Sequence, residues 1–140
     1  MASIDGLPSS PRVILDAGGI LALSRGDGDA RAALERARAE GYVVVIPTPV
    51  LAEVHRGGRD RANVDRVVNK VDALPPTSEE TARRAGELLG ASGTEDPVDA
   101  IVVAEALAAV PSVIITSDPG DIRRLLQTQS DGVRVAVVSA

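Results

Sequence analysis

Acidic residues follow several apolar runs in this chain of 140 residues. Asp16 follows residues 13–15, and Asp118 follows a run that begins at residue 113. Glu53 lies about one turn into the predicted helix that follows another such run, and Asp99 lies near the start of a long apolar stretch. A carboxylate beside a buried strand is costly unless a proton or a cation compensates its charge. These four positions are therefore the first candidates for chemistry.

A cluster of carboxylates is suited to binding a hard divalent cation. In a parallel α/β sheet, the carboxyl ends of the strands and the loops after them form the ligand crevice. Acids gathered there repel one another unless protons or a cation offset their charge. Mg²⁺ and Mn²⁺ take oxygen ligands, commonly carboxylates and water. With such ions, the cluster would form the machinery of metal-assisted phosphodiester hydrolysis.

Most of these acids also have a purely structural interpretation. Asp before Pro is a good N-cap, so Asp96 and Asp118 could cap helices. Asp99 and Asp121 could then be first-turn carboxylates that favour the helix dipole. Glu53 could be the solvent-facing residue of an amphipathic helix. Nothing structural requires all of these acids together, so their combination favours a site.

Apolar runs without in/out alternation are separated by helical patterns, which is typical of a parallel sheet covered on both faces. We expect strands at residues 12–16, 42–46, 112–116 and 133–138. We expect helices at residues 29–40, 48 to 57, 60–74, 77 to 91, 96 to 110 and from 118 onward. Thr48 and Thr77 are predicted N-caps, the second in a capping box with Glu80. The prediction is one α/β domain over residues 12–140, with a sheet of about four strands between helices, after a flexible lead-in at residues 1–11.

The composition argues against several other classes of protein. The net charge of −5 does not fit a generally basic nucleic-acid binder, although a local basic patch remains possible. The chain has no Cys, so disulfides and thiolate metal sites are excluded. No segment approaches ~18 apolar residues, and we expect a soluble, cytoplasmic protein. A phospho-accepting receiver domain needs a Lys after a late strand, but the sole Lys, Lys70, is predicted to lie within a helix.

Four stretches, in order, resemble the PIN-domain family and, more narrowly, the VapC-like toxin ribonucleases of type II toxin–antitoxin pairs. They are VILDAGGILAL, PTPVLAEVHRG, DPVDAIVVAEAL and VIITSDPGDIRRLL, and they cover most of the chain from residue 12. By this resemblance, the acidic quartet that holds Mg²⁺ or Mn²⁺ is matched by Asp16, Glu53, Asp99 and Asp118. We prefer Asp99 to Asp96 as the third acid because it directly precedes the apolar helix, as in the family.

The resemblance also assigns supporting residues. Asp121 matches a frequent accessory acid, and Thr116 and Ser117 match the polar residues before the last acid. Ala17 departs from the family, whose members often carry Ser or Thr after the first acid. This departure removes a supporting hydroxyl but no metal ligand.

The resemblance implies a metal-dependent endoribonuclease that acts as the toxin of a toxin–antitoxin pair. Asp16, Asp99 and Asp118 would place the metal, and Glu53 would complete the site or orient the attacking water. Such proteins are usually dimers that are neutralised by a small antitoxin inserted into the site. We therefore expect an RNA substrate, a cognate antitoxin and a homodimer as partners.

Basic residues follow Glu53 closely. Arg56, Arg59 and Arg61 are candidates for contacts with RNA phosphates, with a solvated charged turn as the simpler interpretation. His55 is interpreted as a surface residue, because a spacing of two points it away from Glu53 on a helix. The rival hypothesis is a PIN-fold interaction module without catalysis. Metal binding that is lost on Asp→Asn substitution would distinguish the two.

Overall fold

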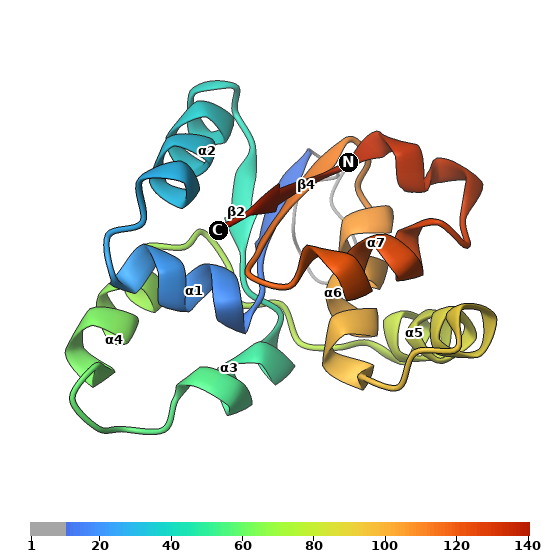
Figure 1. Cartoon of the computed structure of the whole chain (residues 1–140), viewed down its shortest axis with the longest axis horizontal. Coiled ribbons are helices and arrows are strands. Elements are labelled where there is room, and N and C mark those ends of the chain that lie inside the picture. Colours follow the sequence, from blue (N-terminus) through green and yellow to red (C-terminus); the bar gives the residue numbers. More distant parts are fainter. Residues whose placement is uncertain (1–10) are drawn as a thin grey trace.

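The computed structural model describes residues 11–140, and its centre is a sheet of four strands (Figure 1). The strand order is β2-β1-β3-β4, and every neighbouring pair is parallel. The strands are β1 (Arg12–Leu15), β2 (Val43–Val45), β3 (Ser112–Thr116) and β4 (Val135–Ser139). The predicted α/β class with a short parallel sheet is therefore confirmed.

Helices cover both faces of this sheet, with α1, α2 and α4 on one side and α5, α6 and α7 on the other (Figure 1). The helices are α1 (Ala17–Ser24), α2 (Gly28–Ala39), α3 (Thr48–Val54), α4 (Arg61–Asn69), α5 (Glu79–Ser92), α6 (Pro97–Leu107) and α7 (Pro119–Leu126), with a 3₁₀ turn at Ser130–Arg134. Because both faces are covered, every residue of β1 is buried. Within the described part of the chain, no helix is long and apolar enough to cross a membrane.

The predicted helix over residues 60–74 is too long. It ends at Asn69, and the chain then runs beside β2, an edge strand. The Asp72 carboxylate accepts a hydrogen bond of 2.8 Å from the Val44 N–H, and the Ala73 carbonyl accepts one of 3.2 Å from the Ile46 N–H. Unpaired N–H groups of an edge strand need acceptors, and this segment supplies them.

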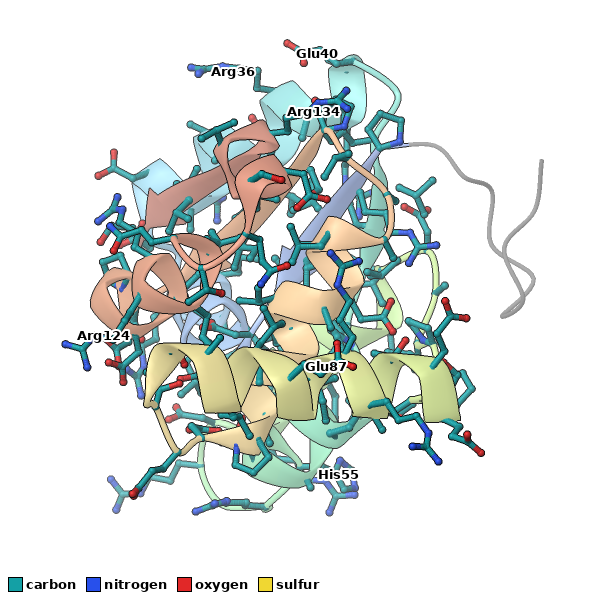
Figure 2. The ribbon with its side chains drawn as sticks, turned by 90° about the vertical axis from the view of Figure 1, so that its right-hand side faces the viewer. Arg36, Glu40, His55, Glu87, Arg124 and Arg134 are labelled. Atoms are coloured by element: carbon teal, nitrogen blue, oxygen red, sulfur yellow. The ribbon has the colours of Figure 1, made fainter. Side chains whose placement is uncertain are left out.

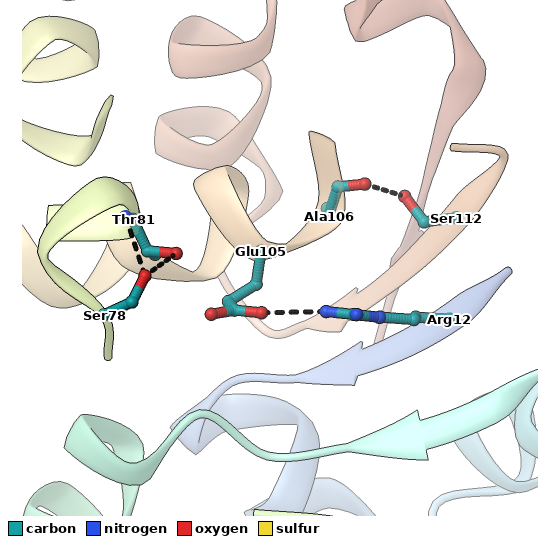
Figure 3. Close-up of polar contacts among 6 residues, drawn as sticks. All are labelled: Arg12, Ser78, Thr81, Glu105, Ala106 and Ser112. Carbon is teal, nitrogen blue, oxygen red and sulfur yellow. Dashed lines mark hydrogen bonds and ion pairs between the residues drawn. The ribbon is translucent and has the colours of Figure 1, made fainter. Parts of the chain in front are cut away.

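Both predicted threonine N-caps are wrong. α3 includes Thr48 as its first residue, and Pro47 holds the N-cap position without a side-chain hydrogen bond. α5 is capped by Ser78, whose hydroxyl accepts a hydrogen bond of 3.1 Å from the Thr81 N–H (Figure 3). The helix therefore begins one residue later than the Thr77 capping box requires.

The start of α1, a helix absent from the expected set, packs directly against the end of β3. A Cβ atom added at Gly19 would overlap the carbonyl oxygen of Ile115, and one added at Gly18 would overlap the side chain of Ser117. Only residues without a side chain allow this approach. The two glycines thus bring the residue that precedes α1 close to the end of β3.

Candidate active site

Asp16 lies between β1 and α1, and its side chain is buried with 7% exposure. It is the N-cap of α1, where its Oδ1 accepts a hydrogen bond of 2.8 Å from the Gly19 N–H. Burial raises the pKa of Asp16 above its ordinary value, while hydrogen bonds from Thr116 and Gly19 act in the opposite direction. This carboxylate is therefore held in place by neighbours on two different elements.

Thr116 links the ends of β1 and β3. Its fully buried hydroxyl donates to the Asp16 carboxylate and accepts a hydrogen bond of 3.0 Å from the Asp118 N–H. Asp118 itself is exposed, and among the described residues its side chain makes no capping hydrogen bond to α7. Asp118 therefore occupies the N-cap position of α7, as the sequence predicts, but its carboxylate does not cap the helix. Ser117, also exposed, lies against Gly18.

Asp96 and Asp99 have different environments at the start of α6. The Asp96 carboxylate accepts hydrogen bonds of 2.9 and 3.2 Å from the N–H groups of Val98 and Asp99, so its predicted role as a cap is confirmed. Asp99 lies in the first helical turn and is half-buried. Asp96 therefore caps α6 through its Oδ1, whereas Asp99 is the half-buried acid of the first turn.

The charges of the candidate acids act on one another. The pKa of Asp99 is raised to about 7. Burial is the largest cause, and the negative charges of the neighbouring acids raise the pKa further; these acids are Asp96, Asp16, Asp118 and Asp121. Charges shift a neighbour's pKa strongly only at short range. The fold therefore brings the acid after β1, the acids after β3 and the start of α6 to one edge of the sheet.

Glu53 of α3 belongs to the same group of acids. Its pKa is raised first by burial and then by the charges of Asp96 and Asp16, whereas Arg56 lowers it. Asp96 is thus more than a cap, because its charge acts on both Glu53 and Asp99. The sequence predicted the cap at Asp96 but not the effect of its charge on Glu53, because that effect depends on how α3 and α6 pack together.

The PIN-domain family profile matches residues 13–125 of this chain. The chain belongs to the PIN-domain family. PIN domains are generally nucleases that use divalent metals. A solved chain of similar fold comes from VapBC2 of Rickettsia felis bound to a DNA fragment from their promoter. It has a TM-score of 0.68 and 16% identity, and the alignment covers 91% of this chain and 98% of that one. No curated protein matches the sequence.

The acids of this PIN domain suit a hard divalent cation by their chemistry, because all of their donor atoms are carboxylate oxygens. Across residues 11–140, no three acidic or histidine side chains are oriented so that they could hold a metal ion together. A pKa of about 7 means that Asp99 is partly protonated at neutral pH, which relieves part of the repulsion. The metal-binding roles of Asp16, Glu53, Asp99, Asp118 and Asp121 therefore stay predictions.

The basic residues after α3 differ in their surroundings. Arg56 lies close enough to Glu53 to lower its pKa. Arg61 forms an ion pair of 3.6 Å with Asp65, one turn further along α4, and Arg59 is exposed. His55 is exposed, as predicted, with its Nδ1 3.9 Å from a carboxylate oxygen of Asp65. Arg56 is therefore the best-placed cation beside the acids.

Proposed function

We propose that this PIN domain is a Mg²⁺- or Mn²⁺-dependent endoribonuclease, the toxin of a toxin–antitoxin pair. The observation that supports this most is the group of acids around Asp99, whose pKa is raised to about 7 by burial and by the charges of four neighbouring carboxylates. Strongly perturbed carboxylates of this kind gather at functional sites, where a cation or a substrate relieves the repulsion. The family supports the nuclease chemistry.

Asp16, Asp99 and Asp118 would hold the ion, and Glu53 would complete the site or orient the attacking water. When bound, the ion supplies a water of lowered pKa and stabilises negative charge on the phosphate oxygens. Asp16 is prepared for this role, because the Thr116 hydroxyl and the Gly19 N–H restrict its orientation. Asp118, in contrast, is exposed, and an incoming ion or phosphate would reach it from solvent.

RNA phosphates would meet the exposed arginines next to the acids. Arg56 and Arg59 lie in the loop between α3 and α4, directly after Glu53. Arg61 is the weakest of the three candidates, because Asp65 already neutralises part of its charge. A protein of net charge −5 needs such a local cationic site to attract an RNA chain.

A groove between α1, α2 and α4 supports the proposed antitoxin partner. It encloses about 610 Å³, and its apolar residues include Leu23, Leu34 and Val67. Its basic residues outnumber its one acid, Glu35; they are Arg25, Arg31, Arg38, Arg66 and Lys70. This pattern suits an antitoxin segment with one apolar face and acidic flanks. The homodimer and the cytoplasmic location also stay predictions.

Thermal unfolding with and without millimolar Mn²⁺ tests the metal site without knowledge of the substrate. A ligand at 100 times its dissociation constant adds about 2.7 kcal/mol, or several degrees for a domain of this size. We expect this rise for the wild type and its loss in Asp99→Asn. Asp29→Asn, which removes an exposed first-turn carboxylate of α2, should keep the full rise.

Cleavage of single-stranded RNA by the wild type, abolished by EDTA and by Asp99→Asn, would then establish the activity. Equal melting temperatures with and without Mn²⁺ in the wild type, together with intact RNA, would favour the interaction module instead.

A further inference from the structure

α6 carries aliphatic side chains around most of its circumference. Its buried residues are Ala100, Val102, Val103, Ala104, Glu105, Ala106 and Leu107. A slide by one turn, about 5.4 Å, would put Ala104 where Ala100 lies and Leu107 where Val103 lies. The chain has no Phe or Trp that could lock the helix by shape. Apolar packing alone therefore defines the axial position of α6 only weakly.

Two buried polar contacts hold the C-terminal half of α6 against the sheet, and Figure 3 shows both. Arg12 Nη1 lies 3.0 Å from Glu105 Oε2, and the exposure of the two side chains is 2% and 4%. The Ser112 hydroxyl donates a hydrogen bond of 2.8 Å to the Ala106 carbonyl, and Ser112 is also buried. Arg12 and Ser112 are register partners at the starts of β1 and β3.

The candidate acids lie at the opposite ends of the same elements. Asp16 follows the last residue of β1, and Asp99 lies in the first turn of α6. Asp99 and Glu105 are joined by about 9 Å of rigid helix, and Arg12 and Asp16 by about 13 Å of strand. The contacts of α6 with Arg12 and Ser112 at the strand starts therefore fix the axial position of α6, and with it the position of Asp99 relative to Asp16.

We propose that the Arg12–Glu105 ion pair, assisted by Ser112, is a register clamp that positions Asp99 against Asp16. Replacing a buried ion pair with apolar residues is often neutral or stabilising, so such a pair is weak evidence for stability alone. A buried polar contact that only one register satisfies excludes the shifted alternatives. The effect of the clamp on metal binding rests on the proposed function, whereas its effect on the position of α6 does not.

The deciding variant is Arg12→Met/Glu105→Met, which removes both charges and keeps apolar volume. The matched control is Glu79→Met/Arg83→Met, which removes an exposed pair of 2.9 Å on α5. The chain has no Cys, so spin labels attach only to the introduced Glu40→Cys and Glu95→Cys. Both sites are exposed; Glu40 precedes β2, and Glu95 precedes α6 at the opposite edge of the sheet.

We expect the deciding variant to unfold near the wild-type temperature, with a label-to-label distance that is broadened or shifted by about 5 Å and Mn²⁺ affinity reduced at least tenfold. The control should match the wild type in all three measurements. A sharp, unchanged distance in the folded deciding variant overturns the clamp. If the wild type binds no Mn²⁺, the proposed function fails, and the distance still decides the clamp.

Arg12→Gln/Glu105→Gln provides the second variant should the deciding one not fold. It removes both charges of the ion pair and keeps polar side chains at both buried positions. A broadened distance between the labels then supports the clamp, and a sharp, unchanged distance overturns it.

Discussion

At the scale of single residues, the contrast between Asp96 and Asp99 shows how environment assigns roles to identical side chains. Two backbone N–H groups donate to Oδ1 of Asp96, whose side chain is exposed. Burial and four neighbouring acids raise the pKa of Asp99 to about 7 instead. One acid therefore stabilises the helix start, and the other carries a charge that the metal-free fold disfavours.

That unfavourable charge predicts a gain in stability for Asp99→Asn in EDTA. Because the folded-state pKa is raised from 3.8 to about 7, the folded state holds its proton more tightly than the unfolded state does. The wild type should thus lose stability as pH rises from about 4 to about 7 and then level off. After allowance for solvent screening of a half-exposed group, Asp99→Asn should be more stable at pH 8 by about 1–2 kcal/mol.

Melting temperatures of the wild type and Asp99→Asn, measured between about pH 5 and about pH 8, check this prediction. The difference between the two melting temperatures should become smaller as the pH falls. Asp29→Asn should give no gain, since its carboxylate is exposed in the first turn of α2. A variant less stable than the wild type at every pH would contradict the proposed repulsion.

At the scale of elements, the close approach of α1 to β3 joins the two strand ends that carry Asp16 and Asp118. A Cβ atom at Gly19 has no room, because it would overlap backbone atoms that cannot move independently. The Asp16 N–H also donates to the Ile115 carbonyl at 3.4 Å. The glycine pair is therefore part of the packing that supports the site.

Gly19→Ala should consequently destabilise the domain by about 1–3 kcal/mol through overpacking. Gly86→Ala is the matched control, since an added Cβ there meets nothing within 4 Å in the middle of α5. In that position the exchange should stabilise by ~0.5–1 kcal/mol, because glycine loses more backbone entropy in a helix. Chemical denaturation measures both, and a neutral Gly19→Ala would show that α1 can move away from β3.

At the scale of the whole molecule, charge is unevenly distributed. The chain carries 20 acidic and 15 basic residues, yet several acids are concentrated at one sheet edge with Arg56 beside them. Figure 2 shows Arg36 and Arg134 at the end of the molecule opposite His55, which directly precedes Arg56. A chain of phosphates would therefore be guided by local cations rather than by net charge.

Binding of a single-stranded RNA should accordingly weaken as salt rises, in a way that depends on these arginines. The double variant Arg56→Ser/Arg59→Ser should have a slope of log K against log salt that is smaller by up to about 1.4. This is about 0.7 for each lost phosphate contact. Arg36→Ser/Arg134→Ser removes the same charge elsewhere and should leave the slope unchanged. Fluorescence anisotropy at several salt concentrations measures it, and equal slopes in both variants would exclude the loop as the RNA contact.

The sequence by itself determined the features that depend on near neighbours in the chain. Apolar runs without alternation must be buried on both faces, so the parallel sheet and its strands followed to within two residues at each end. The Asp-Pro dipeptide at residue 96 specified a cap because capping acts over three residues. The ordered motifs identified the family, because each keeps its acid at a fixed offset from a strand or a helix start.

Only the tertiary structure decided which acids influence one another and what holds them. Asp99 lies 83 residues from Asp16 in the chain (99 − 16), and their proximity follows from the position of α6 across β1 and β3. The pairing of Asp72 and Ala73 with β2 and the Arg12–Glu105 contact across 93 residues likewise left no local pattern. Local propensities act over a few residues, whereas burial, charge coupling and register arise when distant segments pack together.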